Sequence, residues 1–335
     1  MLSSETIRRF ILEAKARIEI LRHDDSLIMP LFTDLHTPSP DHESTLLLTE
    51  LLSDLTREVP CDAVLNLGDL LDMLGRSRHI PTDELTVFFN ALLEKLDNAA
   101  ACPLLCVPGN HDAVGTDFFH PAYWNAIVKH RFANAAAAYD ESGSYFYLDF
   151  DRADTRFIVL STPCASDIEA EFPTQIWRFG DNQLRWLENT ALDTNKHVIL
   201  LMHAPFFSEY RGSMTSTLGV WTGTRAAVSY IYALCGRIEE AEAASAILSR
   251  FHEKTGRLTA CLSGHTHADS LHAPLEEKNG FRNPLPCPQA VTRSFTHPRS
   301  GERHCGFAMD VLVWTPSAHR LDLVRIGDGE DRRIL

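Results

Sequence analysis

The sequence predicts an α/β fold in which β-sheets are covered by helices. Short apolar runs alternate with longer stretches whose apolar residues recur at helical spacing, a pattern typical of layered α/β proteins. The chain has 335 residues, of which 44% are hydrophobic and 23% charged, the composition of an ordinary folded protein. We find no internal repeat and no low-complexity linker, so we predict one domain over residues 1–335.

The first element is an amphipathic helix at residues 4–21, because Ile7, Ile11, Ala14 and Ile18 share one face. This segment lacks the basic start of a signal or transit peptide. The longest strongly apolar run, residues 198–202, is about a quarter of the length of a bilayer-spanning helix. We therefore expect no transmembrane segment and a cytoplasmic protein.

Strands are predicted where apolar runs are bounded by turn residues, at 27–32, 62–67, 103–107, 145–150, 156–160, 197–202, 259–263, 306–313 and 320–326. Helices are predicted between them at 43–57, 82–97, 117–132 and 181–192. Residues 206–257 interrupt this alternation, because a stretch rich in Gly, Ser, Thr and aromatic residues leads into an Ala- and Glu-rich helix. We interpret this segment as an insertion that forms a cap.

Charge and cysteine usage exclude several function classes. The 31 Lys and Arg residues stand against 45 Asp and Glu, for a net charge of −14. That balance disfavours non-specific binding to nucleic acids and to anionic membranes. The eight cysteines form no CxxC motif, which favours buried reduced thiols over disulfides or a thiolate metal site.

Five of the predicted strands end in the same way, with metal-binding side chains within a few residues of the apolar run. These side chains are Asp34 and His36, Asp69 and Asp72, Asn110 and His111, His203, and His265 with His267. Each residue alone has an ordinary alternative as a helix cap, a turn residue or a buried polar group. Together they indicate one site, because ligands bind beyond the carboxyl ends of strands in α/β sheets.

The residue types indicate which metals this site would bind. Side chains two residues apart on an extended segment face the same way, so Asp34 with His36 and His265 with His267 form pairs. Carboxylate, imidazole and amide ligands suit Mn²⁺, Fe²⁺ or Fe³⁺, and Zn²⁺. The choice among these metals stays open.

The ordered motifs DxH, GDxxD, GNHD, a single His after a strand, and GHTH extend from residue 34 to residue 267. This set resembles the calcineurin-like metallophosphoesterases, and in pattern it is closest to their bacterial-type phosphodiesterase members. The resemblance implies a four-layer sandwich of two mixed β-sheets flanked by helices, with two divalent metal ions at the strand ends. It assigns Asp34, His36, Asp69 and His267 to one ion, and Asp69, Asn110, His203 and His265 to the other.

The resemblance also implies a chemistry and two catalytic roles. The chain would be a binuclear metal-dependent phosphohydrolase in which a metal-bridging hydroxide attacks phosphorus. His111 would serve as general acid or as a donor to a phosphate oxygen, and Asp72 would orient its imidazole. Asp112 has either a functional role or a structural one, in which it caps a following helix or braces the loop, and both interpretations stay open.

Two departures from related motifs bear on the substrate. Met73 stands where family members acting on phosphoproteins carry an arginine, and Ala204 stands where cyclic-nucleotide phosphodiesterases often carry a second histidine. We therefore favour hydrolysis of a phosphodiester in a small or nucleotide-like substrate. A phosphomonoesterase or nucleotidase is the alternative. A non-catalytic scaffold is a third possibility, although the motif set is complete.

The predicted cap follows directly after His203 and carries candidate substrate contacts. The rings of Tyr210 and Trp221 would stack on a base, and Arg211 would pair with a phosphate. The alternative is that these aromatic rings only pack the insertion onto the body of the protein.

Overall fold

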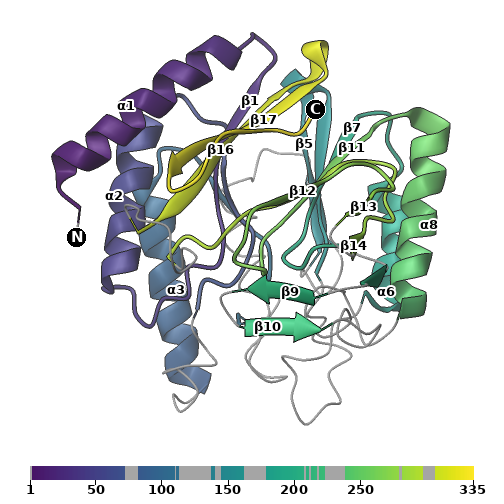
Figure 1. The fold of residues 1–335 in the computed structure, drawn as a ribbon, viewed down its shortest axis with the longest axis horizontal. Coiled ribbons are helices and arrows are strands. Elements are labelled where there is room, and N and C mark those ends of the chain that lie inside the picture. Colours follow the sequence, from purple (N-terminus) through teal and green to yellow (C-terminus); the bar gives the residue numbers. More distant parts are fainter. Residues whose placement is uncertain are drawn as a thin grey trace.

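Two facing β-sheets, each covered on its outer side by helices, make up the computed structural model of the chain (Figure 1). It describes residues 2–71, 82–109, 111–112, 137–139, 145–161, 179–206, 209–210, 213–216, 219–222, 238–278, 281–296 and 306–335. Asp72, Asn110, Arg211 and the predicted helix 117–132 lie outside these residues.

One sheet has six strands within the described residues, in the order β18-β17-β16-β1-β2-β3. The strands are β1 (Leu27–Phe32), β2 (Val64–Asn66), β3 (Leu104–Cys106), β16 (Ala308–Thr315), β17 (Arg320–Gly327) and β18 (Arg332–Arg333). β1, β2 and β3 are parallel to one another, whereas β16 runs antiparallel to β1. This sheet is therefore mixed.

The other sheet has seven described strands, in the order β12-β15-β11-β7-β6-β5-β4. They are β4 (Ala137–Tyr139), β5 (Phe146–Phe150), β6 (Thr155–Val159), β7 (His197–Leu201), β11 (Leu258–Ser263), β12 (Ser270–His272) and β15 (Gln289–Val291). β6, β7, β11 and β15 are parallel, and the outer strands are antiparallel to their neighbours. The prediction of two mixed sheets is confirmed.

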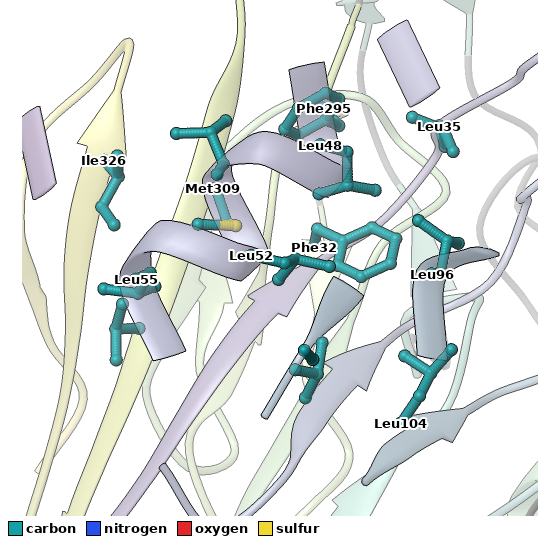
Figure 2. Packing of buried hydrophobic residues seen from close by; sticks show 14 of the residues in the cluster. Phe32, Leu35, Leu48, Leu52, Leu55, Leu96, Leu104, Phe295, Met309 and Ile326 are labelled. Carbon is teal, nitrogen blue, oxygen red and sulfur yellow. The ribbon is translucent and has the colours of Figure 1, made fainter. Parts of the chain in front are cut away.

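The helical layers bury apolar faces against the two sheets. α1 (Ser4–Leu21), α2 (Glu43–Glu58) and α3 (Thr82–Ala99) cover the six-stranded sheet, and α6 (Gly180–Trp186), the π-helical turn η5 (Leu187–Ala191) and α8 (Ile238–Thr255) cover the other. Figure 2 shows Leu48, Leu52 and Leu55 of α2 beside Phe32 and Met309. These positions recur every three or four residues, which places them on one side of a helix.

The strand β1 shows how the layers are built. Ile28 and Phe32 belong to the core under α1 and α2, whereas Leu27, Met29 and Leu31 belong to the core between the two sheets. Side chains alternate between the two faces of a strand, and both faces here are covered. A strand that is buried on both faces is encoded by a continuous apolar run, so it can be recognised in the sequence. The four-layer sandwich is thereby confirmed.

All nine predicted strands form, with ends that differ by no more than two residues from the predicted ones. The predicted helix 181–192 is divided, because α6 passes into the π-helical turn η5. The strands that were not predicted are short, as β12, β15 and β18 show. β18 consists of two arginines, which carry no strand signal.

The described part of the segment 206–257 contains three short strands and α8. The strands are β8 (Glu209–Tyr210), β9 (Ser213–Ser216) and β10 (Gly219–Thr222), and β8 pairs with β14 (Phe281–Arg282), which pairs with β13 (Glu277–Lys278). α8 packs on the seven-stranded sheet and so belongs to the outer helical layer. The hairpin β9–β10 lies below the sheets in Figure 1. The cap remains a prediction.

Two further features concern the protein's environment. Among the described helices, none combines the length and the apolar character needed to cross a membrane. Five cysteines in the described part of the chain carry free thiols, and they are Cys61, Cys102, Cys106, Cys261 and Cys287.

Candidate metal centre

The candidate ligands come from the carboxyl ends of strands in both sheets. Asp34 and His36 follow β1, Asp69 follows β2, and His111 follows β3; His203 follows β7, and His265 and His267 follow β11. The sandwich brings these ends together, so that seven of the residues singled out by the sequence gather at one place. The positions of Asn110 and Asp72 are outside the described residues.

One group of donors consists of Asp34, His36 and His267. The Nε2 atoms of His36 and His267 lie 2.9 Å apart. Asp34 Oδ1 is 3.3 Å from His267 Nε2 and 3.6 Å from His36 Nε2. The Asp34 side chain is completely buried, and both imidazoles are nearly so.

A second group consists of Asp69, His203 and His265. Asp69 Oδ2 is 3.1 Å from His203 Nε2, which is 3.2 Å from His265 Nδ1. The same carboxylate oxygen lies 3.8 Å from His36 Nε2 of the first group. Asp69 therefore stands between the two groups, where a carboxylate that bridges two ions would have to be.

His111 lies beside both groups. Its Nε2 is 3.9 Å from Asp69 Oδ2, and its ring meets the ring of His36 edge to face at 4.5 Å. His36, Asp69 and His111 thus form a third set of donors that could share an ion. His111 Nδ1 is buried and makes no hydrogen bond with any residue that the structure describes.

The chemistry of these donors fits divalent cations. Asp34 Oδ1 is buried without a hydrogen bond within the described residues, which is costly for a carboxylate unless a cation compensates it. Two imidazole nitrogens bound to one ion at about 2.1 Å would lie about 3.0–3.4 Å apart, close to the 2.9 Å between those of His36 and His267. The residues present therefore fit the metal centre that the motifs imply.

The backbone at the centre is held in an unusual conformation. Five candidate ligands, Asp34, His36, Asp69, His265 and His267, have positive φ values between 45° and 67°. Left-handed backbone at a residue other than glycine is strained and must be imposed by its surroundings. Here Asp34 N donates to Gly68 O, His36 N to Asp69 O, and His265 N to Asp34 Oδ2.

Close approach of the loops after β2, β3 and β7 requires glycine at positions 68 and 109. A Cβ atom on Gly109 would lie 2.2 Å from the backbone nitrogen of Asp69, and one on Gly68 would lie 2.6 Å from His203 Nδ1. Gly68 also has a φ of +101°. These glycines let the loops after β2, β3 and β7 touch.

Asp112 braces two of these loops. Its buried carboxylate accepts hydrogen bonds from the backbone nitrogens of Asp69, Leu70, Leu71 and Gly109, at 2.9 to 3.2 Å. Burial and the nearby Asp69 charge raise the pKa of Asp112 to about 6. These contacts match the structural interpretation of Asp112, in the form of a loop brace.

Burial and mutual contacts separate the pKa values of the histidines. Burial opposes protonation of His203, but the adjacent Asp69 carboxylate prevails and raises its pKa to about 9. Burial lowers the pKa of His265 to about 3 and that of His111 to about 4. Although burial opposes it, contact with His203 lowers the pKa of Asp69. Without a cation, His111 is therefore neutral at pH 7.

Other residues that hold the centre had no signal in the sequence. Ser294 Oγ donates to Asp34 O at 2.8 Å, and Thr296 Oγ1 donates to Leu35 O at 3.1 Å. Thr33 Oγ1 donates to Asp34 Oδ2 at 2.7 Å. Ser294 and Thr296 follow the short strand β15, far along the chain from Asp34, so only the folded chain shows their role.

The structure does not settle the predicted substrate contacts. Tyr210 pairs with Phe281 in the sheet formed by β8, β14 and β13, and Trp221 pairs with Met214 in the β9–β10 hairpin. The side chains of Tyr210 and Trp221, and the whole of Arg211, lie outside what the structure describes.

Comparison with known proteins adds to this geometry. The profile of the calcineurin-like phosphoesterase family matches residues 31–269. No curated protein sequence matches the chain. A dimetal phosphatase from Danio rerio has a similar structure, with a TM-score of 0.56, 14% identity, and coverage of 92% of this chain and 98% of the other.

PhoD is a second structural neighbour, with a TM-score of 0.50 and 12% identity. The match covers 89% of this chain and 65% of PhoD. At such identities the structural likeness shows the fold alone, whereas the family profile spans most of the chain, including every candidate ligand. The chain belongs to the calcineurin-like phosphoesterase family and is a metal-dependent phosphoesterase.

Proposed function

We propose that the protein hydrolyses a phosphodiester of a small or nucleotide-like substrate at a centre of two divalent ions. Asp34, His36, Asp69 and His267 would hold one ion, and Asp69, Asn110, His203 and His265 would hold the other. The observation that carries this arrangement is the position of Asp69, whose Oδ2 lies 3.1 Å from His203 Nε2 and 3.8 Å from His36 Nε2. When bound, such ions polarise phosphate oxygens and lower the pKa of water.

His111 is proposed to give a proton to the leaving oxygen or to donate a hydrogen bond to the phosphate. Its Nε2 faces the donors of both groups, and its buried Nδ1 has no partner in the described part of the chain. Asp72 is the proposed partner of Nδ1. A carboxylate there would fix the tautomer and raise the pKa of His111 from about 4 toward neutrality.

The preference for a diester rests on the sequence. Met73 replaces the arginine whose planar guanidinium would suit a dianionic monoester. The segment 206–235 is proposed to select the substrate through Tyr210, Arg211 and Trp221. The position of the β9–β10 hairpin supports this. In Figure 1 the chain enters β1 at the top, so the strand ends that carry the ligands point toward the hairpin below.

Metal identity and location complete the proposal. Carboxylate and imidazole donors suit Mn²⁺, Fe²⁺ or Fe³⁺, and Zn²⁺ alike. The free thiols at the described cysteines support a reducing, cytoplasmic location.

Turnover of two artificial esters tests the proposed reaction. The chelated and dialysed protein is given Mn²⁺ and assayed with bis-p-nitrophenyl phosphate and with p-nitrophenyl phosphate. We expect activity to return with Mn²⁺ and to be greater on the diester. Faster hydrolysis of the monoester would favour the phosphomonoesterase or nucleotidase alternative. Bound metal without turnover of either ester would favour a scaffold.

A further inference from the structure

A cluster of buried and partly buried arginines and aspartates joins the two sheets beside the loop that carries His267. It consists of Asp269, Arg293, Asp310, Arg325 and Arg332, and we call it the arginine–aspartate cluster. Asp310, Arg325 and Arg332 come from β16, β17 and β18 of the six-stranded sheet. Asp269 and Arg293 come from the other side, directly before β12 and shortly after β15.

Arg325 is the centre of the cluster and is 1% exposed. Its Nε donates to Asp310 Oδ1 at 2.7 Å, and its Nη1 donates to Asp328 O at 2.6 Å. Asp310 faces Arg325 across the β16–β17 pair and is fully buried. The remaining Nη2 atom donates to Asp269 Oδ1 at 2.7 Å. Strand pairing thus fixes the guanidinium, which in turn fixes the Asp269 carboxylate.

Asp269 is the point at which the metal-binding loop is anchored. Besides Arg325, its carboxylate lies 3.0 Å from Arg332 Nη1 and 2.8 Å from Arg293 Nε. The residues between the end of β11 and Asp269 belong to no helix or strand. That stretch contains His265 and His267, both in left-handed conformation. Asp269 therefore helps to hold the loop at its far end, together with the pairing of Ser270 with Val291.

The same cluster also reaches the other side of the centre. Arg293 begins a segment whose next three residues bind the loop after β1. Phe295 N donates to Thr33 O at 2.9 Å, and Ser294 Oγ donates to Asp34 O at 2.8 Å. The cluster thus links the loop that carries His267 with the segment that holds Asp34. The side chains of His267 and Asp34 approach each other to 3.3 Å, between Nε2 and Oδ1.

Resting on the proposed function, we infer that Asp269, held by Arg325 and Asp310, is a positioning residue for the donor group of Asp34, His36 and His267. The two sheets each supply part of this group, and the cluster fixes their separation there. The group of Asp69, His203 and His265 depends less on the cluster, because the brace from Asp112 and the bond from Gly264 N to His203 O hold it.

Titration of the metal-free, full-length protein with Mn²⁺, followed by calorimetry, tests this inference. The variant is Asp269→Ala, with Asp269→Asn as the milder change. The matched control is Asp149→Asn. It breaks a buried ion pair in which Arg156 Nε lies 2.7 Å from Asp149 Oδ1. That pair lies near the start of β6, away from the strand ends that carry the ligands. The thermal unfolding midpoint of each metal-free protein is measured alongside.

We expect the wild type to bind two Mn²⁺ ions. Asp269→Ala should weaken one of them by roughly 10- to 100-fold, the usual effect of losing a residue that orients a ligand, and should leave the other unchanged. Asp269→Asn should weaken the same ion by less. Asp149→Asn should lower the unfolding midpoint without changing either dissociation constant.

Two unchanged dissociation constants in both Asp269 variants would overturn the inference and make the cluster purely structural. Equal weakening of both ions would also overturn it, because the effect would then not be confined to one donor group. A wild type that binds two Mn²⁺ ions but hydrolyses neither ester would overturn the proposed reaction and leave this inference standing.

Discussion

Among the described residues other than glycine, left-handed backbone occurs in two kinds of place, and the contrast explains how the centre is built. At the strand ends, the conformation belongs to Asp34, His36, Asp69, His265 and His267. Elsewhere in the described residues it belongs to Asp154, Leu275 and His319. Asp154 and His319 each end a short 3₁₀ turn, and Leu275 lies in the turn before β13.

The two sets differ in what the protein would lose if glycine replaced each residue. In the surface turns, the side chains make contacts away from the proposed site, such as the pair of Asp154 with Arg257 and the ring contact of His319 with Trp314. At the strand ends, the side chain is the proposed ligand and cannot be removed. Its conformation is imposed by bonds such as those from Asp34 N to Gly68 O and from His36 N to Asp69 O. Strain at the centre is therefore coupled to function, and strain in the turns is not.

The largest expected effect comes from removing the charge that both donor groups share. Asp69→Asn should abolish hydrolysis and lower metal occupancy at both positions, because a neutral amide no longer offsets two adjacent cations. Elemental analysis of the purified variant measures the occupancy. Asp322→Asn, which breaks a pair with Arg320 far from the centre, should keep both ions. Normal occupancy in Asp69→Asn would refute the bridging role.

The next effect concerns the histidine that is not a proposed ligand. His111→Gln should keep both ions but lower kcat by roughly 10²- to 10⁴-fold, the range for losing a positioned proton donor. The loss should shrink for esters with a good leaving group, whose oxygen needs little protonation. Rates on diesters of graded leaving-group pKa measure this. Equal losses across the series would assign His111 to phosphate binding instead.

Much of this fold was predictable because burial leaves a pattern. β1, covered on both faces, is a continuous apolar run, and α2 repeats leucines every three or four residues. The group that caps the start of α6 could not be predicted, because the backbone nitrogens of Phe179 and Gly180 donate to Glu240 of α8. A partner some sixty residues away leaves no local signal. β18 could not be predicted for a related reason, because it forms only by pairing with β17 in the folded chain.

The same distinction applies to the residues of the candidate metal centre. The candidate ligands were predictable because their chemistry is distinctive and each follows a strand. The residues that hold them were not, because Ser294 and Asp269 contribute through ordinary polar side chains brought in by the fold. Asp112 was intermediate. The sequence placed it beside His111, but only the structure shows its four bonds to backbone nitrogens.

A smaller effect compares two glycines. Gly109→Ala would place a Cβ atom 2.2 Å from Asp69 N and Oδ1, two atoms already bonded to Asp112 and His111. We expect a loss of stability of about 1–3 kcal/mol, as in other overpacked sites, together with weaker Mn²⁺ binding. Gly256→Ala meets no atom within 4 Å but has a φ of +66°, so it should cost about 1 kcal/mol and leave Mn²⁺ binding unchanged. Equal Mn²⁺ affinities of the Gly109→Ala and Gly256→Ala variants would show that metal binding does not need the loop contact at Gly109.

The smallest effect should have the opposite sign. Leu275 is 60% exposed with a φ of 57°, and its backbone nitrogen donates to Leu285 O at 3.0 Å. Glycine keeps that bond and removes left-handed strain of about 1–2 kcal/mol, against an entropic cost of roughly 0.5–1 kcal/mol. Leu275→Gly should therefore stabilise the protein by about 0.5–1 kcal/mol in denaturant titrations. The matched change Leu12→Gly, at an exposed leucine of α1, should instead destabilise it by about 1 kcal/mol. Equal losses of stability in Leu275→Gly and Leu12→Gly would show that Leu275 is not strained in its turn, and the contrast with the strand ends would fail.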